Sequence, residues 1–167
     1  MMARFSGNRE TAGEMTGVAA DYTLQRETLV RQPISTAFDF FSKAENLERI
    51  TPPWLDFQIL RSAGRMHPGA TIAYRLRVRR VPVKWLTEIE RWSPPFEFVD
   101  VQLKGPYRFW RHTHRFFEVE GGTRIVDIVN YSLPFGPLGR LVHWLQVRSD
   151  LAKIFDYREE RIRTLLG

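Results

Sequence analysis

The chain has 167 residues, of which 43% are hydrophobic and 26% are charged, values typical of a single globular domain. It contains no cysteine, which excludes disulfide frameworks, thiolate metal sites and cysteine nucleophiles. The formal net charge of +6 favours anionic partners without selecting one, and no apolar run approaches the ~18 residues of a transmembrane helix.

Residues 1–21 combine small and charged residues without an apolar period, and they predict a flexible N-terminal tail. They lack the apolar segment of a secretory signal, so we expect a cytoplasmic protein. Residues 22–167 predict a single domain. Within it, residues 22–30 predict a strand, and the apolar spacing in residues 34–41 predicts a helix. A second short helix, residues 44–50, ends before two prolines.

Six further strands are expected between turn-rich separators. They cover residues 55–63, 70–81, 83–92, 96–104, 107–118 and 123–133. Pro82 is the weakest separator, and it is also compatible with a bulge or edge position inside one longer hairpin. The short connections require antiparallel neighbours. Residues 138–166 then predict one long helix or two abutting helices, with a kink near residues 148–150.

This order predicts an α+β fold with a seven-stranded, twisted antiparallel sheet. Two short helices follow the first strand, and the long C-terminal helix covers the concave face of the sheet. Aromatic residues make up 13% of the chain, more than packing alone needs. We therefore expect a cavity lined by aromatic rings between the sheet and the C-terminal helix.

Strand alternation places two histidines on an inner face. In residues 107–118, Trp110, His112, His114 and Phe116 share one face, because side chains alternate along a strand. At least one imidazole is expected to be neutral, hydrogen-bonded to a neighbour and in contact with the cavity, because burial disfavours the charged form.

The neighbouring strands contribute further polar side chains. Asp127 and Tyr131 share a face with Val129, while Val126 and Ile128 lie opposite, so the pattern leaves the inner face of this strand open. If the face of Val129 is the inner one, we expect Asp127 and Tyr131 to meet the histidines across an antiparallel pair. In residues 96–104, the pattern leaves open whether Phe98 and Asp100 or the alternate set faces inward. A self-satisfied polar network is one interpretation of these groups.

Two other kinds of site compete with a ligand pocket for these residues. A metal at His112 and His114 needs a third protein ligand, and Asp127 is the only evident one, so no metal and no other cofactor is predicted. General acid–base catalysis by the histidines, assisted by Asp127 or Tyr131, is chemically reasonable because histidine titrates near neutrality.

A basic stripe occupies the opposite face of residues 70–81. Arg75, Arg77 and Arg79, followed by Arg80, are expected to face solvent. A solvated outer face is favoured over an anion-binding surface. No nucleic-acid partner is predicted, because neither exposed aromatics on the same face nor a helix suited to a groove is evident.

Several motifs carry a resemblance that spans nearly the whole chain after the tail. They are Ile50-Thr51-Pro52-Pro53-Trp54-Leu55, Gly105-Pro106-Tyr107, Trp110-x-His112-x-His114-x-Phe116, and Asp127-x-Val129-x-Tyr131-x-Leu133-Pro134. With the element order, they resemble the SRPBCC superfamily, which includes START domains, the birch pollen allergen family and aromatic polyketide cyclases. The similarity is greatest to a bacterial group labelled polyketide cyclase/dehydrase or ligand-binding protein. The resemblance implies a helix-grip fold and a hydrophobic ligand cavity between the sheet and the C-terminal helix.

The leading hypothesis is a cytoplasmic protein that binds a small hydrophobic or aromatic ligand, lipid-like or polyketide-like, without a cofactor. The expected contact residues are Tyr74, Trp85, Phe98, Asp100, Trp110, His112, His114, Phe116, Asp127 and Tyr131. One alternative is a cyclase- or dehydratase-type enzyme that uses the same histidines. Another is a module that binds an anionic partner or membrane surface through the arginine stripe, without integral membrane contact. The sequence leaves the oligomeric state open.

Overall fold

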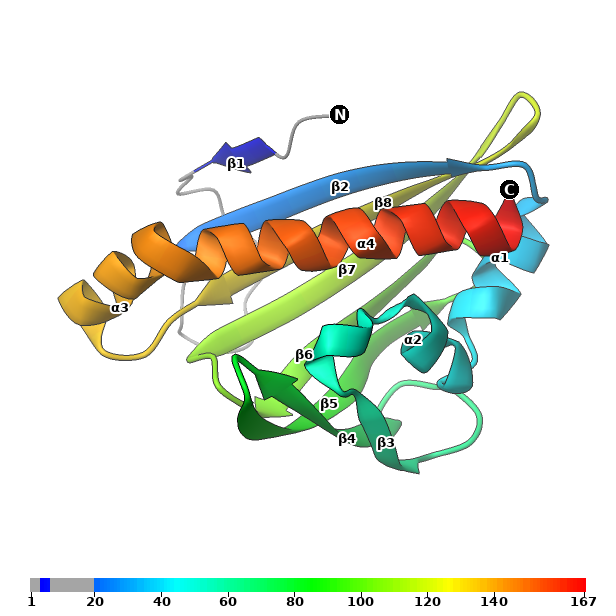
Figure 1. Cartoon of the computed structure of the whole chain (residues 1–167). Coiled ribbons are helices and arrows are strands. Elements are labelled where there is room, and N and C mark those ends of the chain that lie inside the picture. Colours follow the sequence, from blue (N-terminus) through cyan, green and yellow to red (C-terminus); the bar gives the residue numbers. More distant parts are fainter. Residues whose placement is uncertain (1–3, 7–19) are drawn as a thin grey trace.

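The computed structural model describes residues 4–6 and 20–167, and its strands form one antiparallel sheet in the order β1-β2-β8-β7-β6-β5-β4-β3 (Figure 1). The strands are β1 Arg4–Ser6, β2 Tyr22–Val30, β3 Gln58–Ser62, β4 Thr71–Val78, β5 Val81–Ser93, β6 Glu97–Lys104, β7 Phe109–Val119 and β8 Gly122–Ser132. The helices are α1 Ile34–Phe41, α2 Glu45–Ile50, the 3-10 turn η1 Pro53–Leu55, α3 Gly136–Val142, the π-helical turn η2 His143–Val147 and α4 Arg148–Leu166.

The predicted α+β architecture is confirmed. The seven predicted strands are β2 to β8, and β2 pairs with β8. The two short helices follow β2, and Figure 1 shows α4 lying across one face of the sheet. β1 is an additional strand on the outer edge of β2. Apart from residues 4–6 and 20–21, the predicted tail lies outside the described residues.

The hairpin between β4 and β5 turns earlier than the sequence pattern predicts. Val78 pairs with Val81, so the turn consists of Arg79 and Arg80, which have φ values of 49° and 71°. A two-residue turn with positive φ at both positions matches the right-handed twist of the strands, although non-glycine residues are strained there. Pro82, the weakest of the expected separators, lies inside β5 opposite Arg77, which agrees with the alternative expectation of a position inside one longer hairpin.

Two other boundaries differ from the prediction. The strand expected from residue 55 begins at Gln58, because Pro53–Leu55 forms a 3-10 turn and Asp56 adopts a left-handed φ of 44°. In the C-terminal segment, the irregularity precedes the kink expected at residues 148–150. It is the π-helical turn His143–Val147, where the helical hydrogen bonds lengthen by one residue.

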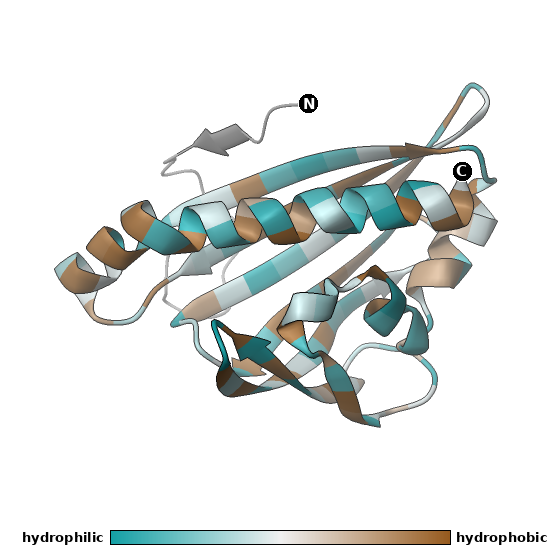
Figure 2. Cartoon of the chain, in the orientation of Figure 1, coloured by the Kyte–Doolittle hydropathy of each residue, from teal (hydrophilic) through white to brown (hydrophobic). Residues whose placement is uncertain are grey.

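The hydrophobic core consists of separate clusters rather than one continuous mass. One joins α1 to the sheet and the end of α4 through residues such as Phe38, Phe116 and Ile162. A second joins β2 and β8 to α4 through Tyr131 and Phe155. In Figure 2, hydrophobic residues also lie along α3, where Leu138 and Leu141 are exposed. Among the described residues, no helix has both the length and the apolarity to cross a membrane.

Candidate ligand cavity and its histidine–aspartate cluster

A cavity of about 540 Å³ lies between the sheet and the helices α1, α2 and α4. Its lining alternates along β4 and β5 as the pleat requires, so that Ile72 and Leu76 face inward from β4 and Trp85 from β5. The C-terminal helix contributes Leu151 and Phe155 from the opposite side. Cavities of this size are typical of sites for small molecules.

One end of the cavity is an aromatic wall. Tyr74 and Trp85 are cross-strand partners, and their rings stack with centroids 5.8 Å apart. Trp110 meets Trp85 edge-on at 5.3 Å and lies 4.7 Å from Tyr107. Such offset and edge-to-face contacts fix the rings relative to one another. The wall therefore offers preorganised aromatic faces to a ligand.

Cross-strand register brings the acidic and imidazole side chains together. Asp100 on β6 pairs with His112 on β7, and His114 on β7 pairs with Asp127 on β8. All four are on the same sheet face, because directly opposed residues in an antiparallel pair project to one side. This register answers the question that the sequence left open: Phe98 and Asp100 face inward.

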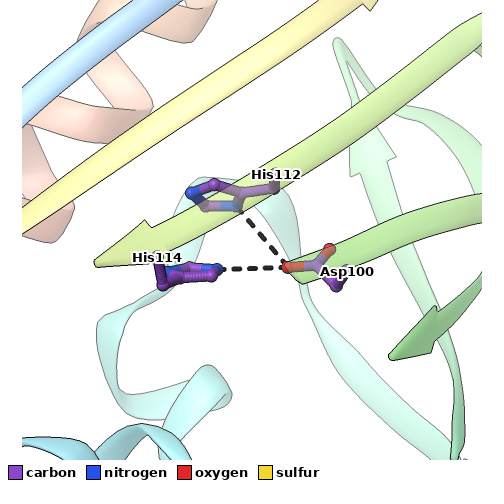
Figure 3. Close-up of side chains that lie close together, drawn as sticks. All are labelled: Asp100, His112 and His114. Carbon is purple, nitrogen blue, oxygen red and sulfur yellow. Dashed lines mark hydrogen bonds and ion pairs between the residues drawn. The ribbon is translucent and has the colours of Figure 1, made fainter. Parts of the chain in front are cut away.

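The four side chains form a compact cluster, three of which are drawn in Figure 3. Nε2 of His112 lies 2.9 Å from Oδ1 of Asp127, and Nε2 of His114 lies 3.1 Å from Oδ2 of Asp100. Nδ1 of His114 also lies 2.7 Å from Oδ1 of Asp127, but the contact is not aligned as a hydrogen bond. Nδ1 of His112 lies 3.8 Å from Oδ2 of Asp100.

The two imidazoles differ in their electrostatics. Burial and the neighbouring His114 lower the pKa of His112, although Asp127 accepts its hydrogen bond. Burial also acts to lower the pKa of His114, but the carboxylates of Asp100 and Asp127 outweigh it and raise that pKa. His112 is thus the imidazole that favours the neutral state.

Both carboxyl groups favour the charged state. Burial acts to raise the pKa of Asp127, but the hydrogen bond from His112 and the close contact with the imidazole of His114 reverse the effect and hold it well below its usual value. The pKa of Asp100 is lowered against burial by the hydrogen bond from His114 and by the charge of His112. The cluster therefore places two ionised carboxylates in a low-dielectric interior.

The structure places seven of the ten expected contact residues on the cavity wall. They are Tyr74, Trp85, Phe98, Asp100, Trp110, His112 and His114. Phe116 lies deeper, in the cluster under α1. Asp127 lies behind the histidines and is 2% exposed. Tyr131 is fully buried, and its hydroxyl pairs with His143 rather than with the histidine pair.

Sequence reasoning missed several cavity residues outside the strands. Arg158 lines the cavity from α4, and its guanidinium lies 5.7 Å from the ring centroid of Phe41 on α1. Its spacing from Phe155 puts it beside the apolar stripe of the helix, which was a usable signal. Tyr107 was missed because the sequence pattern made it the first residue of the strand 107–118, on the face opposite Trp110, whereas β7 begins at Phe109 and Tyr107 lies in the turn ahead of it.

The arginine stripe is largely paired within the protein. Arg75 donates to Gln58, Arg77 lies 3.3 Å from Asp56, and Arg79 contacts Asp150 of α4 through two nitrogens at 3.0 and 3.3 Å. Arg79 also lines the cavity. The side chains are exposed, as expected, but three of the four have acceptors in the chain.

Comparison with known proteins gives a family match and several structural relatives. The sequence model of a family described as polyketide cyclase / dehydrase and lipid transport matches residues 30–154. No curated protein matches the chain.

The structural relatives are distant in sequence. Protein Ms6760 from Mycobacterium smegmatis is 16% identical over 86% of this chain and 90% of its own, with a TM-score of 0.65. TTHA0849 from Thermus thermophilus is 19% identical over 87% and 99%, with a TM-score of 0.64. Ara h 8.0201 is 17% identical over 84% and 96%, with a TM-score of 0.59. At such identities the likeness establishes the shared fold.

Proposed function

The chain belongs to the polyketide cyclase / dehydrase and lipid transport family, and on that premise we propose that its cavity binds a small hydrophobic or aromatic ligand. The volume of about 540 Å³ supports this proposal, since it accommodates a ligand of two or three fused rings or a short acyl chain. The aromatic wall of Tyr74, Trp85, Tyr107 and Trp110 supports a ligand with a planar, apolar body.

The indole nitrogen of Trp85 indicates a polar group on the proposed ligand. Nε1 of Trp85 is buried and has no hydrogen-bond partner among the residues that the structure describes, although the indole lines the cavity. An unsatisfied buried donor destabilises the fold unless something accepts from it. Because this nitrogen is covered in the structure, a ligand oxygen accepts from it only after the surrounding side chains shift, and on this proposal the ligand combines an aromatic or aliphatic body with a carbonyl, hydroxyl or carboxylate oxygen.

Native mass spectrometry of freshly purified protein tests the proposal first. We expect an added mass of a small organic molecule that is lost on denaturation. Recovery of two interconverted compounds, with turnover in solution, would instead identify the cyclase- or dehydratase-type alternative.

A defined probe pair tests the role of Trp85. Acetylnaphthalene carries a carbonyl acceptor, whereas ethylnaphthalene has a similar shape without it. We expect Trp85→Phe to weaken the binding of acetylnaphthalene by about 3- to 10-fold, which corresponds to the loss of one hydrogen bond. The binding of ethylnaphthalene should weaken much less. Trp144→Phe is the matched control, because Trp144 is 72% exposed and does not line the cavity. Failure of both probes to bind the wild-type chain would contradict a ligand cavity of this kind.

A further inference from the structure

We propose that Asp100, His112 and His114 form a divalent metal site on the cavity wall, supported from behind by the carboxylate of Asp127. One donor atom from each of the three ligands lies within 4.8 Å of the others. Figure 3 shows the two imidazole nitrogens directed at the same carboxylate oxygen, Oδ2 of Asp100. The sequence expectation of no metal rested on Asp127 as the only third ligand.

The distances suit a first-row transition metal. Oδ2 of Asp100 lies 3.1 Å from Nε2 of His114 and 3.8 Å from Nδ1 of His112. Metal–ligand bonds of about 2.0–2.2 Å require donor atoms roughly 3.0–3.4 Å apart. The Asp100–His114 distance falls in this range and the Asp100–His112 distance exceeds it, so the proposed site requires Nδ1 of His112 to move slightly toward Asp100. Two imidazoles and one carboxylate favour zinc, iron(II) or cobalt(II) over magnesium or calcium.

Asp127 occupies the place that a supporting carboxylate takes behind metal-bound histidines. Its Oδ1 lies 2.9 Å from Nε2 of His112 and 2.7 Å from Nδ1 of His114. In each ring this is the nitrogen that does not face Asp100. A metal-bound histidine commonly donates its other ring N–H to a carboxylate, which fixes the tautomer and the orientation of the ring. Asp127 performs this task for His112 through a hydrogen bond, and it lies in close contact with the corresponding nitrogen of His114.

The cluster is not a closed hydrogen-bond network by itself. Nδ1 of His112 is 3.8 Å from Asp100, beyond hydrogen-bond distance. Nδ1 of His114 is buried without an aligned partner. Hence neither nitrogen makes an aligned hydrogen bond to a described residue, and Nδ1 of His114 is the one that is also fully buried, whereas buried polar groups are normally paired. A metal ion between the rings and Asp100 satisfies Nδ1 of His112 directly.

The charge balance points the same way. A divalent cation bound to both rings requires both imidazoles to be neutral, and the cation then balances the negative charges of Asp100 and Asp127 in their buried position. Arg158 of α4 is the positive side chain that also acts on both carboxylates. Its guanidinium competes with the metal for them, so the Arg158→Gln variant should bind metal more tightly than the wild-type chain.

The site is open on the cavity side. Asp100, His112 and His114 line the cavity, whereas Asp127 does not. Three protein ligands leave at least one coordination position for a ligand oxygen. Only this consequence rests on the proposed ligand binding; the metal site itself stands without it.

Metal titration of the full chain, freed of metal with a chelator, tests the proposal. We expect one equivalent of Co²⁺ to give the visible absorption of a protein-bound ion, and Zn²⁺ to displace it. His112→Ala should weaken binding by at least about 100-fold, and Asp127→Asn by about 10- to 100-fold. His67→Ala, in an exposed loop, should leave the affinity unchanged.

Paramagnetic NMR of the unmodified chain keeps the test independent of variant folding. Bound Co²⁺ should shift the imidazole resonances of His112 and His114 strongly and those of His67 little. Absence of stoichiometric binding at micromolar metal, or equal shifts at His67, would overturn the proposal. Because Co²⁺ alone is the probe, that result would leave naphthalene binding by the cavity intact, and the two proposals fail separately.

Discussion

The hydroxyl of Tyr131 lies 2.8 Å from Nε2 of His143, which joins β8 to the π-helical turn ahead of α4. The ring of His143 also stacks on Tyr22 of β2, with centroids 3.5 Å apart and planes 11° from parallel. The sequence assigned Tyr131 to the histidine pair, but His143 is its partner. The irregular turn is therefore held by two strands of the sheet, and α4 starts from a fixed position over the cavity.

Tyr131→Phe should destabilise the fold, because it leaves a buried nitrogen of His143 without its partner. We expect a loss of about 1–3 kcal/mol in the free energy of unfolding, measured by urea denaturation. Tyr157→Phe, at a partly exposed ring that packs against Trp54, should change it by less than about 0.5 kcal/mol. Equal effects of the two variants would show that the hydroxyl of Tyr131 contributes no specific stability.

The free energy of unfolding should fall in mild acid because His143 is harder to protonate in the folded chain than in the unfolded chain. Burial, followed by the charge of Arg148, lowers the pKa of this imidazole in the folded chain. The unfolded chain takes up the proton near pH ~6.5, so the unfolded state binds more protons below that pH. The stabilisation is complete above pH ~6.5 and is lost as the pH falls towards the folded pKa. Urea denaturation of wild type and His143→Phe between pH 5 and 8 should show this component only in the wild type.

We expect the ion pair between Arg79 and Asp150 to slow the release of a ligand from the cavity, and we call this pair the latch. It connects the β4–β5 turn to the first turn of α4, and its side chains are 58% and 28% exposed. Exposed pairs contribute less than about 1 kcal/mol. We expect Arg79→Ala to leave the melting temperature nearly unchanged and to speed release of acetylnaphthalene about 3- to 10-fold, measured by stopped-flow fluorescence.

High salt provides a control for the latch, because screening weakens exposed ion pairs. The wild-type release rate should approach that of Arg79→Ala at about 1 M salt, where the Debye length is roughly 3 Å. Release rates of Arg77→Ala, whose pairing with Asp56 does not involve α4, should match the wild type. If Arg79→Ala and the wild type release acetylnaphthalene at the same rate at low salt, the proposed role of the latch is wrong.

Filling the cavity should remove ligand binding without unfolding the chain. Leu76 is buried and lines the cavity, so Leu76→Trp places the added ring in free volume. Overpacking a dense core costs about 1–3 kcal/mol, and here we expect less than about 1 kcal/mol, with at least a 10-fold loss of acetylnaphthalene affinity. Leu103→Trp, at a site 49% exposed outside the cavity, is the matched control. Retained affinity in Leu76→Trp would place the ligand elsewhere.

Secondary structure and inner faces were accessible from local patterns. The alternation Trp110-x-His112-x-His114 predicted which side chains of β7 face inward, because the two-residue period belongs to the strand itself. The helix Ile34–Phe41 was predicted with its observed bounds for the same reason, since its apolar spacing is local. The Arg79-Arg80 turn was not, because neither residue is typical of a positive φ.

The site itself depended on tertiary structure. The sequence pattern placed His112 and His114 on an inner face, but the inner face of the Asp127 strand stayed open, and the pairing of Asp100 with His112 is a matter of register between β6 and β7. Register depends on packing across the whole sheet, including irregularities between β5 and β6. Likewise, only the docking of α4 brings Arg158 to the cavity and Asp150 to Arg79. Periodicity is a property of neighbouring residues, whereas the contacts that form a cavity join segments far apart in the chain.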